Sequence, residues 1–326
     1  MSFLKQLFGN GKQKSPAQKQ EDTKRQQSET LKYDGVRAIK MNEWALAIRF
    51  LSEALTLDKN DEEVKRFLAE AYLNAGEMEK ALPLLQDLAN SDPNNLTILL
   101  TLAQAAGQLG QWQNMAETCQ KAFLLDSNNA TIYFLQAKAC HGQGDDITAI
   151  AMLTKALMID ESMSEAYHLR ANILMGMGQA AEAEKDIDIL LQSNKEQDEL
   201  WIMKGDACRA LQKDEEAITA YRTAREKNPF NQEAVLREGA LFAQLGQLDK
   251  ALETYNNAIA EQPEFAEAYK ARGEVKRALH DEEGALDDLK QSFKIKPELE
   301  THIDGEFSNM ENKVEDMLRR NNPYGF

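Results

Sequence analysis

The chain has few cysteines and no long apolar run. Three of its 326 residues are cysteine, and no apolar stretch approaches the roughly 18 residues that a membrane-spanning helix requires. The first residues, MSFLKQLFGNG, place Lys5 inside their apolar patch and lack the small-residue motif of a cleavage site. We therefore expect no secretory signal peptide, no disulfide framework and a cytoplasmic location.

Motifs of catalysis and of cofactor binding are also missing. The sequence has no Gly-rich phosphate loop, no nucleophile elbow and no metal-ligand spacing. Its carboxylates are scattered at helical spacings, where we expect them to serve solubility. The sequence therefore predicts no catalytic, cofactor-binding or metal site, and we do not expect an enzyme.

Charge is unevenly distributed along the chain. The net charge is −16, yet the first 25 residues carry six basic and only two acidic side chains. An acidic body repels phosphate backbones, so we expect no nucleic-acid partner. Residues 1–27 are rich in Gln, Lys and Ser, and we expect this basic arm to be disordered.

A period of 34 residues repeats eight times without an insertion or deletion. The blocks are residues 28–61, 62–95, 96–129, 130–163, 164–197, 198–231, 232–265 and 266–299. Position 8 of the block is always small: Gly35, Ala69, Ala103, Ala137, Ala171, Gly205, Gly239 and Gly273. Position 20 is alanine except for Met115 in the third block. Small residues at these fixed positions predict that two helices approach closely there.

Apolar residues at helical spacing surround the small positions, so each block predicts two amphipathic helices. Five blocks have glycine at position 15, where a left-handed helix end suits it: Gly76, Gly110, Gly144, Gly178 and Gly246. Four blocks have proline at position 32, which ends the second helix: Pro93, Pro229, Pro263 and Pro297. The cysteines fall at core positions, where we expect buried thiols: Cys119, Cys140 and Cys208. Each block is therefore a predicted helical hairpin.

This pattern resembles the tetratricopeptide repeat family, whose series of aromatic and small residues before a proline is clearest in one block: Trp201, Gly205, Ala217, Tyr221, Ala224 and Pro229. Four residues depart from the pattern: Asp34, Met115, Lys276 and Ser292. The resemblance implies an all-α, right-handed superhelical solenoid of eight helix-turn-helix repeats. Residues 300–326 are expected to form a capping helix and a short tail, because apolar residues recur there at steps of three and four: Ile303, Phe307, Met310, Val314 and Met317.

In this family the first helices line a concave groove with positions 2, 5, 9 and 12. Position 5 then forms an apolar stripe interrupted by one histidine: Leu100, Phe134, His168, Ile202 and Leu236. With Lys138 and Asn172 at position 9, these residues are the predicted partner-binding site, since an exposed apolar strip often binds a partner. The alternative is that the stripe packs against neighbouring first helices.

Position 2 is mostly acidic: Glu29, Glu63, Glu165, Glu199, Glu233 and Glu267. An acidic groove edge suits a partner segment with apolar anchors and some Lys or Arg. Alternatively, these carboxylates only stabilise the positive ends of helix dipoles. The family's clamp for acidic chaperone tails is absent, because Lys32 is followed by Val36 at position 9.

The histidines suggest one metal alternative. His141 at position 12 and His168 at position 5 are implied to face the groove, whereas Cys140 at position 11 is implied to point into the core. Ligands on opposite faces do not share an ion, so we expect no zinc site there.

The leading functional hypothesis is a cytoplasmic, non-catalytic scaffold that binds a protein segment in the groove. The alternative is a membrane-peripheral assembly factor, recruited by the arm through a short apolar face next to basic residues: Phe3, Leu4, Leu7 and Phe8. Self-association is left open.

Overall fold

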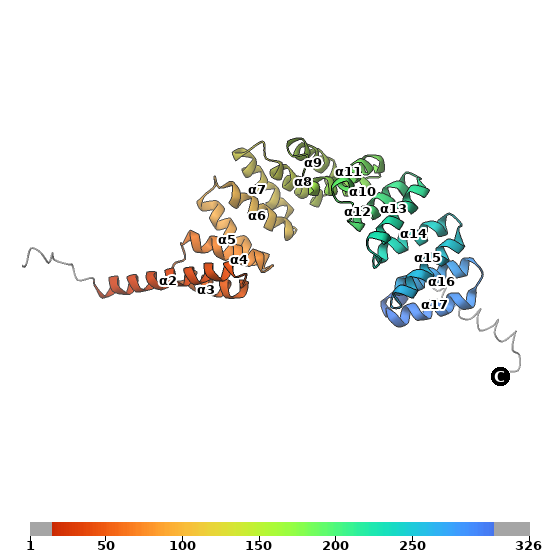
Figure 1. Cartoon of the computed structure of the whole chain (residues 1–326). Coiled ribbons are helices and arrows are strands. Elements are labelled where there is room, and N and C mark those ends of the chain that lie inside the picture. Colours follow the sequence, from red (N-terminus) through yellow and green to blue (C-terminus); the bar gives the residue numbers. More distant parts are fainter. Residues whose placement is uncertain (1–14, 303–326) are drawn as a thin grey trace, which may run out of the picture. The chain divides into compact units, whose positions relative to one another are not determined.

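The computed structural model describes residues 15–302, which form sixteen α-helices and a final 3-10 turn, η1 (Pro297–His302), with no strand in that range. The first helices of the hairpins are α2 (Pro16–Lys40), α4 (Glu62–Asn74), α6 (Leu96–Gln108), α8 (Ala130–Gly142), α10 (Ser164–Gly176), α12 (Asp198–Ala210), α14 (Gln232–Gln244) and α16 (Ala266–Ala278). The second helices are α3 (Trp44–Leu57), α5 (Met78–Ser91), α7 (Trp112–Leu125), α9 (Asp146–Ile159), α11 (Ala180–Ser193), α13 (Asp214–Lys227), α15 (Leu248–Glu261) and α17 (Glu282–Ile295). This confirms the predicted all-α array of helix pairs (Figure 1).

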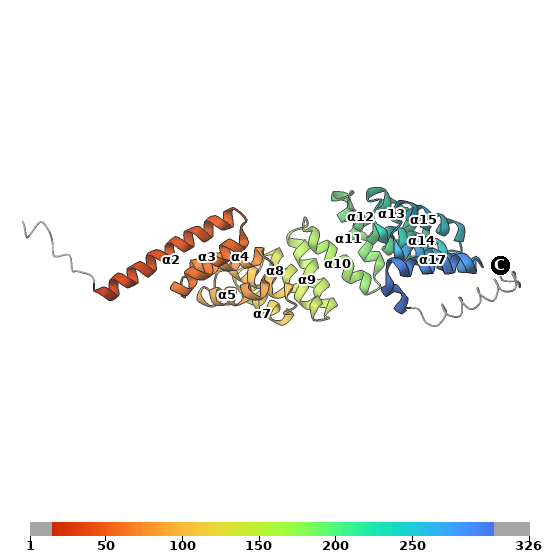
Figure 2. The same ribbon diagram turned by 90° about the horizontal axis from the view of Figure 1, so that it is seen from below.

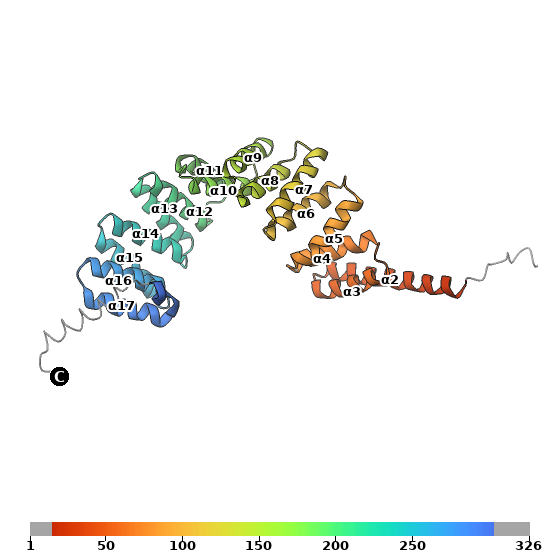
Figure 3. The same cartoon turned by 180° about the vertical axis from the view of Figure 1, so that it is seen from behind.

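The 34-residue period determines where the helices begin. From α4 to α16, every first helix starts at the first residue of its block. Several of these starts are capped by the preceding side chain, as where Asp61 Oδ1 accepts a hydrogen bond from the Val64 N–H at 3.0 Å. The same pairing of helices is visible from behind in Figure 3.

The array divides into two compact units, residues 1–166 and 167–326. In the first unit, α6, α7 and α8 share one core cluster that includes Leu99, Leu102 and Leu135. In the second unit, α12 to α16 enclose another cluster that includes Tyr221 and Tyr255. Each unit therefore has its own apolar core, as expected when neighbouring repeats bury each other's faces.

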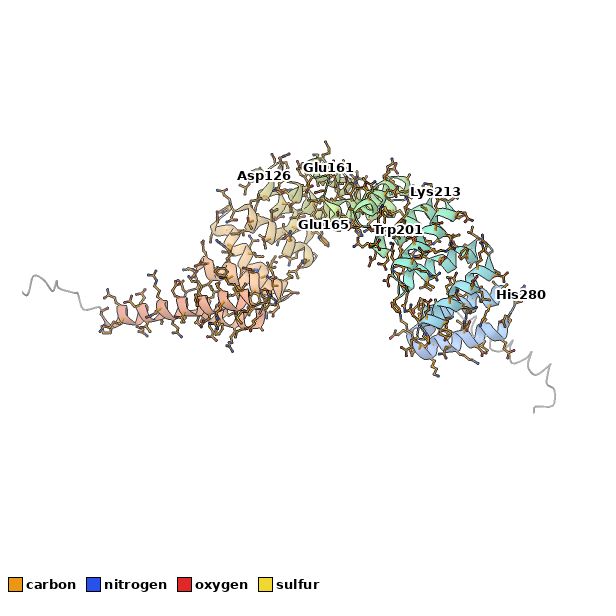
Figure 4. All side chains as sticks on the ribbon, viewed as in Figure 1. Asp126, Glu161, Glu165, Trp201, Lys213 and His280 are labelled. Carbon is orange, nitrogen blue, oxygen red and sulfur yellow. The ribbon has the colours of Figure 1, made fainter. Side chains whose placement is uncertain are left out.

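Position 15 has a left-handed backbone in all eight repeats. Five of these residues are the predicted glycines, with φ between +67° and +83°. The other three are Asn42, Gln212 and His280, with φ of 57°, 60° and 65°. His280, which Figure 4 labels, thus occupies a strained turn position. The next N–H closes the helix end, as where Lys213 N–H donates to the Cys208 carbonyl at 2.9 Å.

Gln212→Gly should raise the free energy of unfolding by about 0.5–1 kcal/mol, because a left-handed non-glycine residue costs more than glycine's extra freedom in the unfolded chain. Gln111→Gly is the matched control, since Gln111 has an ordinary φ of −81°. We expect no gain from this control in urea denaturation. Equal effects of the two substitutions would contradict the argument.

The small residues at positions 8 and 20 lie where the two helices of a hairpin touch. A Cβ on Gly205 would lie 2.3 Å from the Tyr221 ring, and one on Gly273 would lie 3.1 Å from the Ala285 carbonyl oxygen. Met115, the one large residue at position 20, is fully buried because Gly107 on α6 makes room for its sulfur. The departure at Met115 is therefore compensated within the same hairpin.

Ala149→Leu should lower the free energy of unfolding by about 1–3 kcal/mol, because Ala149 is fully buried and a larger side chain overpacks the seam. Ala151→Leu, two residues further along α9 at an exposed position, is the control and should change stability little. Chemical denaturation of both variants measures the difference. An unchanged midpoint for Ala149→Leu would show that this position is not a close contact.

The expected disorder of residues 1–27 is wrong for the part that the structure describes. Helix α2 begins at Pro16 and projects beyond α3 (Figure 2). A capping box starts it: Ser15 Oγ accepts from the Gln18 N–H at 3.2 Å, and Gln18 Oε1 accepts from the Ser15 N–H at 2.9 Å. The apolar pattern of the sequence does not reveal this start, because residues 16–27 are all exposed. The rest of the arm and nearly all of the predicted capping helix lie outside the described residues.

Candidate partner-binding groove

A cleft opens between the first helices α4 and α6 of the first unit. Its volume is about 470 Å³, and its rim is formed by Arg66, Glu70 and Leu73 from α4 and by Thr97 and Thr101 from α6. In block numbering these are positions 5, 9 and 12 of one repeat and positions 2 and 6 of the next. Neighbouring first helices α6 and α8 pack more closely than α4 and α6 do. The cleft therefore lies on the face that the resemblance assigns to the groove.

The floor of this cleft is apolar. Leu85 and Leu88 from the second helix α5 line it and are buried in the core of the first unit. Ile98 closes it from α6. Because the rim carries one basic and one acidic side chain, Arg66 and Glu70, the cleft offers an apolar recess with polar groups at its edge. This composition is typical of a site for one apolar side chain of a ligand.

Three predicted site residues lie in the first unit. Leu100 and Phe134 are half-buried and pack against the same core cluster. Lys138 lies on the next turn of α8, with its Nζ 5.8 Å from the centre of the Phe134 ring. The structure thus brings Phe134 and Lys138 together, but it shows a stripe that is partly used for packing between helices.

The other four predicted residues lie in the second unit. His168 and Asn172 are exposed, and their side-chain nitrogens Nδ1 and Nδ2 are 3.2 Å apart. Leu236 is half-buried against the core. Ile202 is only 6% exposed and belongs to that core. The expectation that Ile202 is an exposed anchor is therefore wrong, because neighbouring helices of the second unit cover it.

The acidic residues at position 2 are largely paired. The Lys32 ammonium lies 2.9 Å from a Glu63 oxygen and 3.1 Å from a Glu29 oxygen. Although burial lowers it, these hydrogen bonds raise the pKa of Lys32 above its ordinary value. In the second unit, Glu267 accepts from Lys296 at 2.7 Å, and Glu233 accepts from Arg237 at 3.0 Å. The groove edge is thus less available to a basic partner than the sequence suggests.

The sequence reading missed a set of buried carboxylates in the second unit. Asp186, Glu238 and Asp288 are buried, contrary to the expectation that the carboxylates serve solubility. Arg170 binds both oxygens of Asp186, at 2.8 and 2.7 Å, and Arg272 does the same with Asp288, at 2.8 and 2.6 Å. Position 7 is a clue, because it varies in the first unit (Asp34, Leu68, Leu102 and Gln136) but is charged in every repeat of the second unit: Arg170, Lys204, Glu238 and Arg272.

One cluster among the described residues has atoms close enough to hold a metal ion. The ligand atoms of Glu184, Cys208 and Glu216 all lie within 4.8 Å of one another. However, the Glu184 oxygens already accept from Lys204 at 3.0 Å and from Lys213 at 2.8 Å (Figure 4 labels Lys213). Burial raises the pKa of the Cys208 thiol to about 11, so the thiol is protonated at neutral pH. The donor set fits an ion-pair cluster better than a metal centre.

Glu184→Gln should lower the free energy of unfolding by about 1–2 kcal/mol at pH 7, because it removes charge-assisted hydrogen bonds. The hydrogen bond from Lys213 contributes most to lowering the pKa of Glu184. Because the pKa of Glu184 is lower in the folded state, its ionised carboxylate stabilises the fold at pH values above the ordinary glutamate pKa of about 4.3. This stabilisation is lost as the pH falls further, through the folded-state pKa.

Urea denaturation between pH 3 and 7 should therefore show a difference between Glu184→Gln and wild type that shrinks towards acid. Glu182→Gln, on the same helix but exposed, serves as the control with little effect at any pH. A difference that does not depend on pH would contradict the assignment.

The structure also shows where Cys140 and His141, considered above as possible metal ligands, lie. Cys140 is buried, whereas His141 is exposed and its Nδ1 lies 2.6 Å from Asp146 Oδ1. The two side chains therefore occupy different environments, as the resemblance implies. All three cysteines are free and buried, which confirms their predicted core positions. Over residues 15–302, none of the helices is both long and apolar enough to cross a membrane.

Comparisons with known proteins agree with this architecture. Two family models described as tetratricopeptide repeat match residues 38–104 and 168–232, and one described as TPR repeat matches residues 239–279. Together these matches cover more than half of the chain. No curated protein matches it.

Similar solved structures show the same fold. A tetratricopeptide repeat protein from Parabacteroides merdae is 18% identical, with 72% of this chain and 93% of that chain covered and a TM-score of 0.55. PilF from Pseudomonas aeruginosa is 13% identical, with 66% of this chain and 96% of that chain covered and a TM-score of 0.51. YrrB, described as a TPR protein with an unusual peptide-binding site, is 25% identical, with 61% of this chain and 99% of that chain covered and a TM-score of 0.46. At these identities the first two show the fold alone.

Proposed function

Because the chain belongs to the tetratricopeptide repeat family, we propose that it is a non-catalytic scaffold that binds a protein segment on the groove face of its first helices. Proteins of this family are generally scaffolds without catalytic activity. The observation that carries the proposal is the cleft between α4 and α6, which opens on that face with an apolar floor. A recess of this kind accepts a side chain of an extended or helical segment.

In the first unit, the partner segment contacts two parts of the groove face that differ in depth. The cleft receives an apolar anchor, and Leu100, Phe134 and Lys138 form a ledge further along the same face. The ledge is half-buried before any partner binds, so it adds less newly buried area than a fully exposed stripe would. The main anchor is therefore expected at the cleft rather than at Phe134.

In the second unit, the exposed pair His168 and Asn172, together with half-buried Leu236, offers a further contact surface for the partner. Its members are mainly polar, apart from Leu236. At position 2, Lys32, Arg237 and Lys296 pair with four of the six carboxylates. These three cations reduce the negative charge of the groove edge without cancelling it, so the main anchors of the partner are apolar and its basic residues contribute less.

The membrane-peripheral alternative depends on Phe3, Leu4, Leu7 and Phe8, which lie outside the described residues. The exposed start of α2 contributes only Pro16 and Ala17 as apolar residues. Burial of apolar area drives interfacial binding. No described feature favours this alternative.

Thr97→Arg should block the cleft, because Thr97 is exposed at its rim. We expect partner binding to weaken by at least about 10-fold, as for loss of a central anchor. Thr56→Arg adds the same side chain at an exposed site on the second helix α3 and should bind normally. Phe134 is a poorer choice, because changing a half-buried residue also alters stability.

The measurement is affinity capture from an extract of the source cells with wild type and both variants, compared by quantitative mass spectrometry. A partner lost from Thr97→Arg but kept by Thr56→Arg supports the groove. Circular dichroism melting verifies that both variants fold. If both variants capture the same proteins as wild type, the cleft is not the binding site.

A further inference from the structure

A surface motif recurs on the second helices of two consecutive repeats. Lys121-Ala-Phe-Leu124 on α7 and Lys155-Ala-Leu-Met158 on α9 occupy the same block positions, 26 to 29. Leu124 is 86% exposed and Met158 is 81% exposed. At position 29 the other repeats have polar, charged or small residues: Thr56, Asn90, Gln192, Glu226, Ala260 and Lys294. The apolar pair is thus confined to one place in the first unit.

A groove is lined by Leu124 of this pair and by Lys155, one helical turn before Met158 on α9. Its volume is about 720 Å³, and it is bounded by α7, α8 and α9. Tyr133 and Ile132 from α8 line it, with Phe123 from α7 and Met152 from α9. The Phe123 and Tyr133 rings meet edge to face at 5.6 Å. In Figure 4, the labelled Asp126 marks the end of α7.

These residues do not belong to the groove face discussed above. The exposed side chains are on second helices, whereas the cleft of the proposed function lies between the first helices α4 and α6. Phe123 and Leu125 are each 39% exposed next to Leu124. A cluster of exposed apolar side chains around a groove is a mark of an interaction site.

The charge at this groove differs from that of the chain. Its lining includes Lys121 and Lys155 but only one acidic residue, Glu117, in a chain of net charge −16. The Lys155 ammonium lies 5.8 Å from the centre of the Tyr133 ring, at the apolar floor. At about 0.15 M salt, exposed charges are screened beyond roughly 8 Å. Among the lining residues the two lysines outnumber Glu117, so the groove favours acidic groups in a bound segment.

We propose that this second-helix groove binds an amphipathic helix of a partner protein, with apolar side chains in the groove and acidic residues beside them. The apolar stripe of the helix covers Leu124, Met158 and Tyr133. Its carboxylates pair with Lys121 and Lys155, which are one repeat apart and so constrain the line along which the helix axis lies. A helix laid into an apolar groove is an established mode of segment recognition.

The test uses the full-length protein and two labelled synthetic helical peptides of about 16 residues, long enough to form a marginal helix. Both peptides carry the same leucine stripe, flanked by glutamates in one and by lysines in the other. Fluorescence anisotropy at about 0.15 M salt should show at least about 10-fold tighter binding of the glutamate peptide.

Leu124→Glu should weaken binding of the glutamate peptide by at least about 10-fold. Its exposure means that folding should be unaffected, which melting curves verify. Gln192→Glu adds the same charge at the equivalent, exposed site of α11 and should bind like wild type. The double variant Lys121→Glu/Lys155→Glu should reverse the preference towards the lysine peptide.

Equal binding of the two peptides, or unchanged binding to Leu124→Glu, would overturn the proposal. Sedimentation measures whether the wild-type protein forms a dimer. A dimer that dissociates in the Leu124→Glu variant would identify a second copy of the chain as the occupant of the groove and would also overturn the proposal. Thr97→Arg should leave peptide binding intact. A failure of this proposal can therefore be distinguished from a failure of the proposed binding at the cleft between α4 and α6.

Discussion

The close approach of two helices at positions 8 and 20 is the constraint on which every hairpin depends. Alanine at position 20 is fully buried in block after block, and in several hairpins a glycine makes room for a large residue on the facing helix. Gly205 and Gly239 lie against the rings of Tyr221 and Tyr255, and Gly107 lies against Met115. Packing density leaves little freedom at such seams. A large residue at these seams is therefore accommodated where the facing residue is glycine.

This seam explains which parts of the structure the sequence predicts well. The period, the turn glycines and the small positions are local and repeated, so they predict the helix pairs and their starting residues. Three left-handed residues that are not glycine, among them His280, are predictable from the period but not from residue type. The helical start of α2 is missed because a capping box, not an apolar pattern, determines it. Apolar character alone does not separate exposed Leu124 from buried Ile202, whereas the polar or small residues at position 29 of the other repeats would have indicated that Leu124 is exposed.

The two helices of a hairpin present different surfaces to partners. First helices supply the cleft at α4 and α6 with a mixed-charge rim, whereas the second helices α7 and α9 supply an apolar groove with two lysines. Position in the block determines on which surface a residue lies, and residue type then determines what that surface binds. If both proposals hold, the scaffold binds two segments on separate faces. Linking such contacts strengthens overall binding when one partner carries both segments.

The charged residues at position 7 of the second unit have a consequence for assembly of the array. Repeats with nearly identical apolar seams risk pairing with the wrong neighbour while they fold. In the second unit, Arg170 faces Asp186, Arg272 faces Asp288, and Glu238 faces Arg222 and Arg225. A mismatched pair that put Glu238 next to Asp186 would bury two like charges, which is strongly unfavourable. The buried charges thus disfavour those pairings of helices that would bring two carboxylates together.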